Sequence, residues 1–206
     1  MQPFDFLDVA EPVSRPPFVF PNIPDPKISE IEPGLYIGDL MSSYEADCLA
    51  ENNITAKLSL QKGDSARWRY ASNRKIVPAA RHLLVPCAAS STQDLLVRMT
   101  EMCDFIEEMR GETNKHVLVH CTTGTCRAVA VVAAYLMRKH HLSPDSALAL
   151  IKEKQNVNLK SNFMEQLVVW DETGYGMKLD MTSGPTKLKP PPSCHMLHTL
   201  TRGPRG

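Results

Sequence analysis

The sequence lacks an excess of charge, a long apolar run and a regular spacing of cysteines. Its 206 residues carry 23 Lys and Arg against 23 Asp and Glu, so the formal net charge is zero. This balance argues against nucleic acid and against a polybasic membrane anchor. The longest apolar run, residues 128–137, is well short of the roughly 18 residues that a membrane-spanning helix needs. We therefore expect neither a nucleic-acid partner nor a membrane partner.

The cysteines and the N-terminus bear on the cellular compartment. The six cysteines are scattered among predicted helix, strand and loop contexts and show no disulfide-scaffold spacing. The N-terminal segment is acidic and has no basic region, which argues against a secretory signal. One metal-like grouping, residues 194–198, lies in a predicted tail and lacks further ligands. We expect a cytoplasmic protein, a nuclear one or one found in both, with no metal and no cofactor.

Composition divides the chain into three parts. Residues 1–27 contain seven prolines, which exclude helix and strand and predict an extended N-terminal arm. Residues 28–174 alternate strand and helix patterns and form the predicted domain. Residues 175–206 are rich in Gly, Pro, Lys, Ser and Thr and are predicted to be a flexible tail. The Pro-rich tails are candidate contacts for a partner, and residues 187–192 suit a proline-reading domain.

The predicted domain begins with two short strands joined by the turn pair Pro33-Gly34. Ser42 and Glu45 have the spacing of a capping box, which predicts a helix starting there. The spacing of apolar residues predicts a helix after Asp94 and further helices toward residue 174. Further strand candidates are residues 56–60, 76–77, 82–85 and 117–120. This alternation predicts an α/β fold with a sheet that has helices on both faces.

Residues 117–139 are the most informative stretch. Residues 117–120 form a β-branched, apolar run that predicts a buried strand, and residues 127–139 are a run of helix formers without Gly or Pro. A small polar loop, residues 121–126, lies between them. Consecutive backbone N–H groups face into such a loop, and the positive end of the helix dipole lies behind them. The stretch therefore predicts an anion-binding site.

Cys121 and Arg127 stand at the two ends of this loop. The loop amides and the helix N-terminus favour thiolate over thiol and can bring a cysteine pKa from about 8.5 down to about 3.5–7.5. Arg127 can bind two oxygens of a phosphate. Gly124 permits a positive φ, while His120 is expected on the other face of the strand, where it holds the loop by hydrogen bonds. These groups together describe hydrolysis of a phosphate monoester through a phosphocysteine intermediate.

The sequence of residues 120–127, His-Cys-Thr-Thr-Gly-Thr-Cys-Arg, resembles the signature of the cysteine-dependent protein phosphatases. The flanks at residues 31–38, 105–106, 134–137 and 163–167 are similar to those of the dual-specificity branch. The resemblance implies a phosphotyrosine-phosphatase-like fold, with a central, mostly parallel sheet of four to five strands flanked by helices. It also implies phosphorylated protein substrates and no metal. The site residues it implies are the nucleophile Cys121, Arg127 for the phosphate and the transition state, and a phosphate-binding loop of Thr122, Thr123, Gly124, Thr125 and Cys126.

The sequence departs from the family pattern at two places. The family's general acid is an Asp about thirty residues before the cysteine, but residues 87–90, which occupy the expected positions, hold no carboxylate. The nearest carboxylate is Asp94, the candidate general acid, whose other interpretation is the N-cap of the following helix; Asp64 is a more distant candidate. Ala128 stands where the family has a Ser or Thr that helps the thiolate depart. Breakdown of the intermediate is therefore expected to be slow.

The predicted function is a slow protein phosphatase for phosphotyrosine and, as a second class, phosphoserine and phosphothreonine. A missing acid biases activity toward phosphotyrosine, because phenol-like leaving groups need the proton least. The alternative is a catalytically impaired, phosphatase-like module that binds phosphoproteins. A third hypothesis, another phosphate monoester such as a phosphoinositide or an RNA 5′ end, is weakened because no Lys and no second Arg lies in the loop. Cys126 and Cys87 are candidate disulfide partners of Cys121 on oxidation, or simple thiols.

Overall fold

A computed structural model describes residues 25–63, 71–88, 93–111 and 115–176. Most of the predicted N-terminal arm, nearly all of the C-terminal tail and the candidate acid Asp64 lie outside these ranges. Within them, no helix is long and apolar enough to span a bilayer. The same part of the chain holds no group of three or more His, Cys, Asp or Glu side chains that suits a metal ion.

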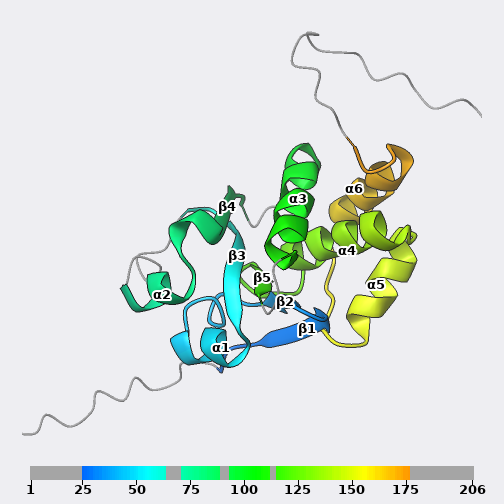
Figure 1. Cartoon of the computed structure of the whole chain (residues 1–206). Coiled ribbons are helices and arrows are strands. Elements are labelled where there is room, and N and C mark those ends of the chain that lie inside the picture. The colour runs from blue at the N-terminus through cyan, green and yellow to red at the C-terminus, as the bar shows by residue number, and fades with distance from the viewer. Residues whose placement is uncertain (1–24, 64–70, 89–92, 112–114, 177–206) are drawn as a thin grey trace, which may run out of the picture.

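A five-stranded sheet forms the centre of the domain (Figure 1). The strands lie in the order β1-β2-β5-β3-β4, and only the edge strand β1 runs antiparallel to its neighbour. The four parallel strands therefore all end at one edge of the sheet. The prediction of an α/β fold with a mostly parallel sheet is confirmed. The strands are β1 (Ile28–Glu32), β2 (Leu35–Gly38), β3 (Ile54–Gln61), β4 (His82–Pro86) and β5 (His116–His120).

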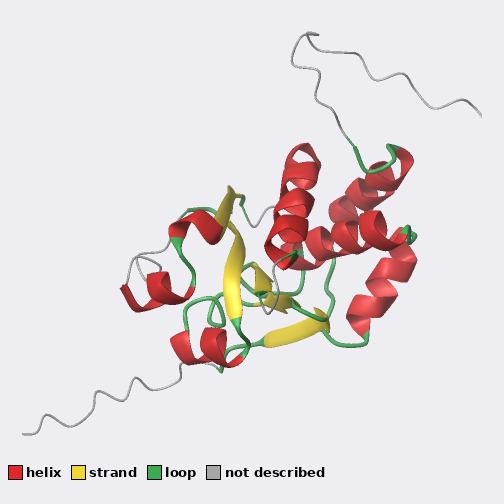
Figure 2. Ribbon diagram, in the orientation of Figure 1, coloured by secondary structure: helices red, strands yellow, loops and turns green. Residues whose placement is uncertain are grey.

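The helices divide unequally between the two faces of the sheet (Figure 2). Four helices, α3 to α6, gather on one face, and the short helices α1 and α2 lie on the other. Short 3₁₀ turns precede β4 and α3. The helices are α1 (Ala46–Glu51), α2 (Ala71–Ile76), α3 (Met99–Arg110), α4 (Arg127–His140), α5 (Pro144–Lys152) and α6 (Ser161–Glu172).

Side chains along β5 alternate between two apolar cores. Val117 and Val119 belong to the larger core beneath α3 to α6, whereas Leu118 belongs to the smaller core beneath α1 and α2. This alternation follows from the period of two in a strand. It places His120 on the face of Leu118, while Cys121, the next residue, joins the larger core. The predicted opposite orientation of His120 and Cys121 is confirmed.

The helix α4 is the centre of the larger core. Every residue from Arg127 to Met137 is buried, as its nearly continuous apolar sequence predicted. Trp170 of α6 packs there with no exposed surface and donates a hydrogen bond from its indole N–H to the carbonyl of Ala134 at 3.1 Å. Burial on all sides fixes the N-terminus of α4, and with it the loop that precedes the helix.

Two local predictions are wrong. The hydroxyls of Ser42 and Ser43 donate to the carbonyls of residues 39 and 40, three positions back, and α1 begins only at Ala46 without a side-chain cap. The serines stabilise a turn instead of a helix start, because the hydroxyl of a serine can hydrogen-bond to nearby backbone groups in a turn as well as at the N-terminus of a helix. Ile76 ends a helix and is not part of a strand. A short apolar pair does not by itself distinguish helix from strand.

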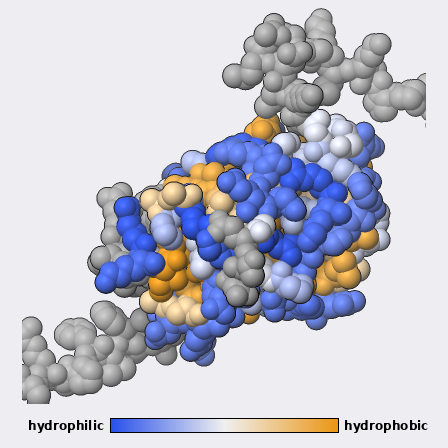
Figure 3. Space-filling view, viewed as in Figure 1, coloured by the Kyte–Doolittle hydropathy of each residue, from blue (hydrophilic) through white to orange (hydrophobic). Residues whose placement is uncertain are grey.

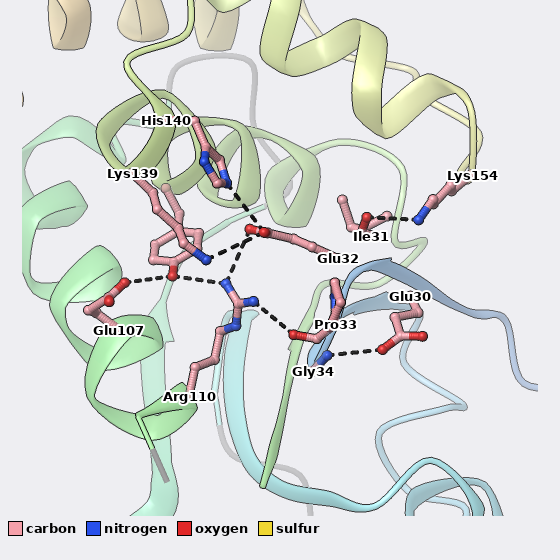
Figure 4. Close-up of polar contacts among 11 residues, drawn as sticks. Glu30, Ile31, Glu32, Pro33, Gly34, Glu107, Arg110, Lys139, His140 and Lys154 are labelled. Carbon is pink, nitrogen blue, oxygen red and sulfur yellow. Dashed lines mark hydrogen bonds and ion pairs between the residues drawn. The ribbon is translucent and has the colours of Figure 1, made fainter. Parts of the chain in front are cut away.

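A cluster of charged side chains fastens the amino end of the sheet (Figure 4). Glu32 of β1 lies 3.2 Å from Arg110 of α3, 3.4 Å from Lys139 and 3.3 Å from His140 of α4. Arg110 also donates to the hydroxyl of Tyr135 at 2.9 Å. Partial burial alone would raise the pKa of Glu32, but the cations outweigh it and hold that pKa below its usual value. The cluster joins β1, α3 and α4 at the end of the sheet away from the phosphate loop.

The face of the molecule in Figure 3 is mainly hydrophilic, with apolar residues in separate patches. Large apolar side chains that are exposed in the described residues are few and belong to α5, α6 and the turn before α3. They are Val97, Leu150, Val168 and Val169.

Candidate active site

The predicted phosphate loop joins β5 to α4 at the carboxyl edge of the sheet. Its middle residue, Gly124, has a φ of +70°. A Cβ atom added there would lie 2.8 Å from the carbonyl oxygen of Gly38, which real Cβ atoms essentially never do. Position 124 therefore needs glycine for both its backbone conformation and its close approach to β2. The predicted positive φ at Gly124 is confirmed.

Three carbonyl groups of the loop are bound from outside. The carbonyl of Thr122 accepts from the N–H of Leu40 at 3.3 Å, and that of Thr125 accepts from the N–H of Asn158 at 2.8 Å. The carbonyl of Gly124 accepts from the amide of Gln155 at 3.2 Å. In a trans peptide the N–H of the next residue points away from the preceding carbonyl. Fixing these carbonyls to the scaffold therefore turns the following N–H groups away from it, which suits an anion cradle.

Beside this loop lies a pocket of about 300 Å³. Its wall combines the loop with the connection between α5 and α6 and the first turn of α6. The structure thus brings Cys121 and Arg127 into one cavity, together with every residue of the predicted phosphate loop except Gly124. The lining residues are Cys121, Thr122, Thr123, Thr125, Cys126, Arg127, Asn158, Lys160 and Phe163.

Arg127 folds back over the loop, as its position predicted. One nitrogen of its guanidinium, Nη2, donates to the hydroxyl of Thr122 at 3.0 Å. The other, Nη1, donates to the carbonyl of Cys87 at 3.3 Å and lies 3.6 Å from the Cys87 sulfur. The side chain is almost completely buried. Two elements, the phosphate loop and the end of β4, therefore hold the guanidinium in place.

Cys87, the first residue of the loop after β4, contacts Arg127 through both its carbonyl group and its sulfur. Burial raises the pKa of the Cys87 thiol, while the hydrogen bond from Arg127 lowers it and nearby Cys121 raises it further. The net rise keeps Cys87 a neutral thiol near pH 7. All five cysteines in the described residues are free thiols. A disulfide of Cys121 with Cys87 or Cys126 on oxidation stays a prediction.

His120 supports the loop from the opposite face of the sheet. Its ring is completely buried, and its Nε2 lies 2.6 Å from the hydroxyl of Ser59 on β3. That hydroxyl lies 2.7 Å from Nε2 of His82 on β4. Burial, reinforced by the nearby Lys57 ammonium, lowers the pKa of His120 well below its usual value and that of His82 to about 4. Both rings are therefore neutral at pH 7, and they connect three strands beneath the site.

Asp94 takes a position that fits its capping interpretation. It is exposed, precedes the 3₁₀ turn Leu96–Arg98, and accepts a hydrogen bond from the N–H of Leu96 through its Oδ1 at 2.8 Å. It is not among the residues that line the pocket with Cys121. Its role as general acid stays a prediction, and residues 89–92 before it lie outside the described chain.

Sequence reasoning missed several residues that complete the site. Ser59 and His82 support His120, and Gln155 and Asn158 hold the phosphate loop. Lys160 adds a second cation to the pocket wall. One signal was present for Ser59, because it is a polar residue between two leucines in the middle of a buried strand. The others follow from the packing of distant segments and gave no local signal.

A strand-loop-helix with a buried cysteine at one end and a folded-back arginine at the other defines a cysteine-dependent phosphatase. A family model described as "Dual specificity phosphatase, catalytic domain" matches residues 35–173. The chain therefore belongs to the dual-specificity phosphatase family.

Relatives agree with this assignment. Human dual specificity protein phosphatase 6 is 34% identical over 151 residues, covering 70% of this chain and 36% of the relative. Human dual specificity protein phosphatase 22 is 33% identical over 143 residues, covering 68% of this chain and 71% of the relative. The match covers about a third of the length of phosphatase 6 and of Mpk3 from Drosophila melanogaster, which is 31% identical.

Solved structures show the same fold. The Yvh1 phosphatase domain from Chaetomium thermophilum superposes with a TM-score of 0.64 at 25% identity, covering 72% of this chain and 97% of that chain. The human tyrosine phosphatase-like serine/threonine/tyrosine-interacting protein superposes with a TM-score of 0.63 at 23% identity, covering 71% and 96% of the two chains.

Proposed function

We propose that this protein is a phosphatase that removes phosphate from phosphoproteins through a phosphocysteine formed on Cys121. The observation that carries the proposal is the shared pocket. It contains a buried cysteine, an arginine anchored from two sides, and a loop whose carbonyls are bound from outside. Each of these features suits a phosphate dianion, and family membership agrees with the chemistry.

The reaction has two steps. The Cys121 thiolate attacks the phosphorus, a sulfur–phosphorus bond forms, and the bond from phosphorus to the substrate oxygen breaks. The loop N–H groups and the Arg127 guanidinium bind the non-bridging oxygens and stabilise the charge in both steps. Water then attacks the phosphorus, which releases inorganic phosphate and restores the thiolate. No oxidant or further reactant is required.

We infer that phosphotyrosine is the preferred substrate class and that phosphoserine and phosphothreonine react more slowly. No carboxylate is among the described residues that line the pocket. Without a donor for the leaving oxygen, an alkoxide departs much less readily than a phenolate, because general acid catalysis is worth about 10²–10⁴-fold. Ala128, which is completely buried after Arg127, offers no hydroxyl to assist the second step, so that step is proposed to be slow.

The second candidate is a module that captures phosphoproteins and turns them over negligibly. Two observations favour it, the lack of a carboxylate among the described lining residues and the apolar side chain at position 128. Both candidates share the same phosphate cradle and differ only in turnover. In either case we propose phosphorylated proteins as partners, a further partner for the Pro-rich tails, and the cytoplasm, the nucleus or both as the location.

Phosphate release separates the two candidates. We expect wild-type protein to hydrolyse an aryl phosphate and a phosphotyrosine peptide, and Cys121→Ser to lose at least about 10³-fold in kcat/KM. Cys48→Ser is the matched control, since Cys48 is a buried residue of α1 and does not line this pocket. Wild-type rates no greater than those of Cys121→Ser would contradict the enzyme. If the wild-type protein binds the phosphopeptide but hydrolyses it no faster than Cys121→Ser, the capture module would be established.

A further inference from the structure

Three polar side chains form a hydrogen-bond series beneath the phosphate loop. Ser59 of β3 lies between His120 of β5 and His82 of β4. The Ser59 hydroxyl oxygen lies 2.6 Å from Nε2 of His120 and 2.7 Å from Nε2 of His82. Both distances are those of strong hydrogen bonds. Because Ser59 and His120 are buried, the series is shielded from water at the end that approaches the site.

The direction of the two hydrogen bonds is restricted by the number of protons. The Ser59 hydroxyl has one proton and can donate it to only one of the two rings. The lowered pKa values of His82 and His120 keep both rings neutral, so each ring carries one N–H, on either Nδ1 or Nε2. At least one ring must therefore donate to the Ser59 oxygen. If His120 accepts from Ser59, its own proton lies on Nδ1 and His82 is the donor; if His120 donates, its Nδ1 has no proton.

The surroundings of the His120 Nδ1 atom decide between these arrangements. Nδ1 is buried, and no group in the described residues completes a hydrogen bond to it. Burial lowers the pKa of His120 most strongly, whereas the backbone of Cys121 acts in the opposite direction and raises that pKa. A carbonyl oxygen that faces a ring N–H has this effect, because it stabilises the proton on the ring. Since Nε2 faces Ser59, the proton of His120 lies on Nδ1 and is directed at the Cys121 carbonyl.

We propose that His82 is a positioning residue that sets the direction of this hydrogen-bond series. Its Nε2–H donates to Ser59, and the Ser59 hydroxyl is thereby left to donate to Nε2 of His120. His120 then holds the Cys121 carbonyl through Nδ1–H, a bond that closes fully as the loop tightens around phosphate. In a trans peptide the Thr122 N–H points away from that carbonyl and so faces the pocket. His82 thus acts on the phosphate cradle without touching the substrate.

The tautomers of the two histidines can be measured on the intact protein without turnover. Long-range proton–nitrogen correlation spectra are recorded at neutral pH on protein labelled with ¹⁵N-histidine, and each ring is assigned by the loss of its signals in a variant. We expect His120 to carry its proton on Nδ1 and His82 to carry its proton on Nε2. A proton on Nε2 of His120, or on Nδ1 of His82, would overturn the proposal.

Two variants of the same shape test whether His82 sets the direction. In His82→Gln the amide can still donate to Ser59, whereas the carboxylate of His82→Glu can only accept from it. We expect His120 to keep its proton on Nδ1 in His82→Gln and to move it to Nε2 in His82→Glu. Arg74→Gln is the control for charge, since Arg74 is exposed and lies near His82; it should leave the His120 tautomer unchanged. The same His120 tautomer in the Gln and Glu variants would overturn the proposal.

The effect on rate rests on the proposed function, and it is measured separately with an aryl phosphate. We expect kcat/KM to fall at least about fivefold in His82→Glu relative to His82→Gln, mainly through kcat, because the Thr122 N–H is misplaced. Arg74→Gln should change it less than about twofold. Hydrolysis with a His120 tautomer that ignores position 82 would leave the phosphatase intact and refute the role of His82. No hydrolysis, with a tautomer that follows the donor at position 82, would refute the phosphatase and support the hydrogen-bond series.

Discussion

The loop after β5 and the loop after β4 end at the same edge of the sheet, yet they are built differently. The β5 loop receives hydrogen bonds from Leu40 just after β2, from the connection between α5 and α6, and from Arg127. The described part of the β4 loop is bound from outside only at its two ends, where the Cys87 N–H donates to the carbonyl of Gln61 at 3.1 Å and the Gln166 amide donates to the carbonyl of Gln93 at 2.9 Å. Its nearest carboxylate, Asp94, is bound to the N–H of Leu96.

This difference separates two parts of the chemistry. Binding a phosphate and attacking it need only the β5 loop, which many contacts preorganise. Protonating the leaving group is the part that the family pattern assigns to the β4 loop, and here that loop presents Cys87 to the site instead of a carboxylate. We therefore expect variants in the β5 loop to have large effects and variants of Asp94 to have small ones.

After Cys121→Ser, the largest effect is expected from Arg127→Lys. A lysine keeps the charge but cannot hold Thr122 and Cys87 while it binds two phosphate oxygens. We expect kcat/KM for an aryl phosphate to fall by about 10²–10³-fold, with little change in melting temperature. A fall of less than tenfold would show that the loop N–H groups alone provide most of the binding, and would weaken the case for a preorganised guanidinium.

Gly124→Ala tests the geometry of the same loop. The added methyl meets the Gly38 carbonyl at 2.8 Å, and φ is +70°. We expect a loss of about 2–4 kcal/mol in the free energy of unfolding, measured by urea denaturation, together with weaker binding of phosphate.

The matched control for that substitution is Gly63→Ala. No atom lies within 4 Å of a Cβ added at Gly63, so we expect a change within about 0.5 kcal/mol. Equal stability of the Gly124 and Gly63 variants would mean that the close contact with β2 is not a constraint on the loop.

The pH dependence of stability tests the connection that Ser59 and His82 make between β3 and β4. The pKa of His82 is lowered from 6.5 to about 4, chiefly by burial and further by Lys57 and Arg74. Between these values the unfolded ring binds a proton and the folded ring does not, so stability is fully present above 6.5 and is lost as the pH falls toward 4.

His82→Gln removes that titration while an amide can still bond to Ser59. We expect wild type to lose on the order of 1 kcal/mol more than this variant between about pH 7.5 and about pH 5, after allowance for partial exposure of the ring. Urea denaturation at both pH values measures the difference. Parallel losses in the two proteins would show that His82 is not the responsible group.

The smallest effect is expected from Asp94→Asn. Asparagine can still accept a hydrogen bond from the N–H of Leu96, so the cap is kept while the acid is lost. We expect kcat/KM for a phosphoserine peptide, the substrate that most needs an acid, to change less than about twofold. A fall of about 10²-fold or more would establish Asp94 as the general acid and would remove the contrast between the two loops.

The centre of the site was predictable from sequence because it is local. A strand, a glycine-containing loop and a helix follow one another between residues 116 and 140, and their patterns fix where Cys121 and Arg127 lie. The supports were not predictable, because they depend on which segments become neighbours. Ser59 meets His120 only because β3 lies next to β5, and Lys160 reaches the pocket only through the path between α5 and α6. The capping box at Ser42 was wrong because a local turn uses the same hydroxyls.

The most direct test of the account is the chemical state of Cys121 during turnover. Wild-type protein is mixed with an excess of aryl phosphate and quenched before the first turnover is complete, and the peptide that contains Cys121 is analysed by mass spectrometry. With Ala128 behind Arg127, we predict a burst of the aryl alcohol close to one equivalent of enzyme, followed by slower release, with phosphate on the Cys121 sulfur. Linear release without a burst, and no phosphate on Cys121 at any time, would contradict the account.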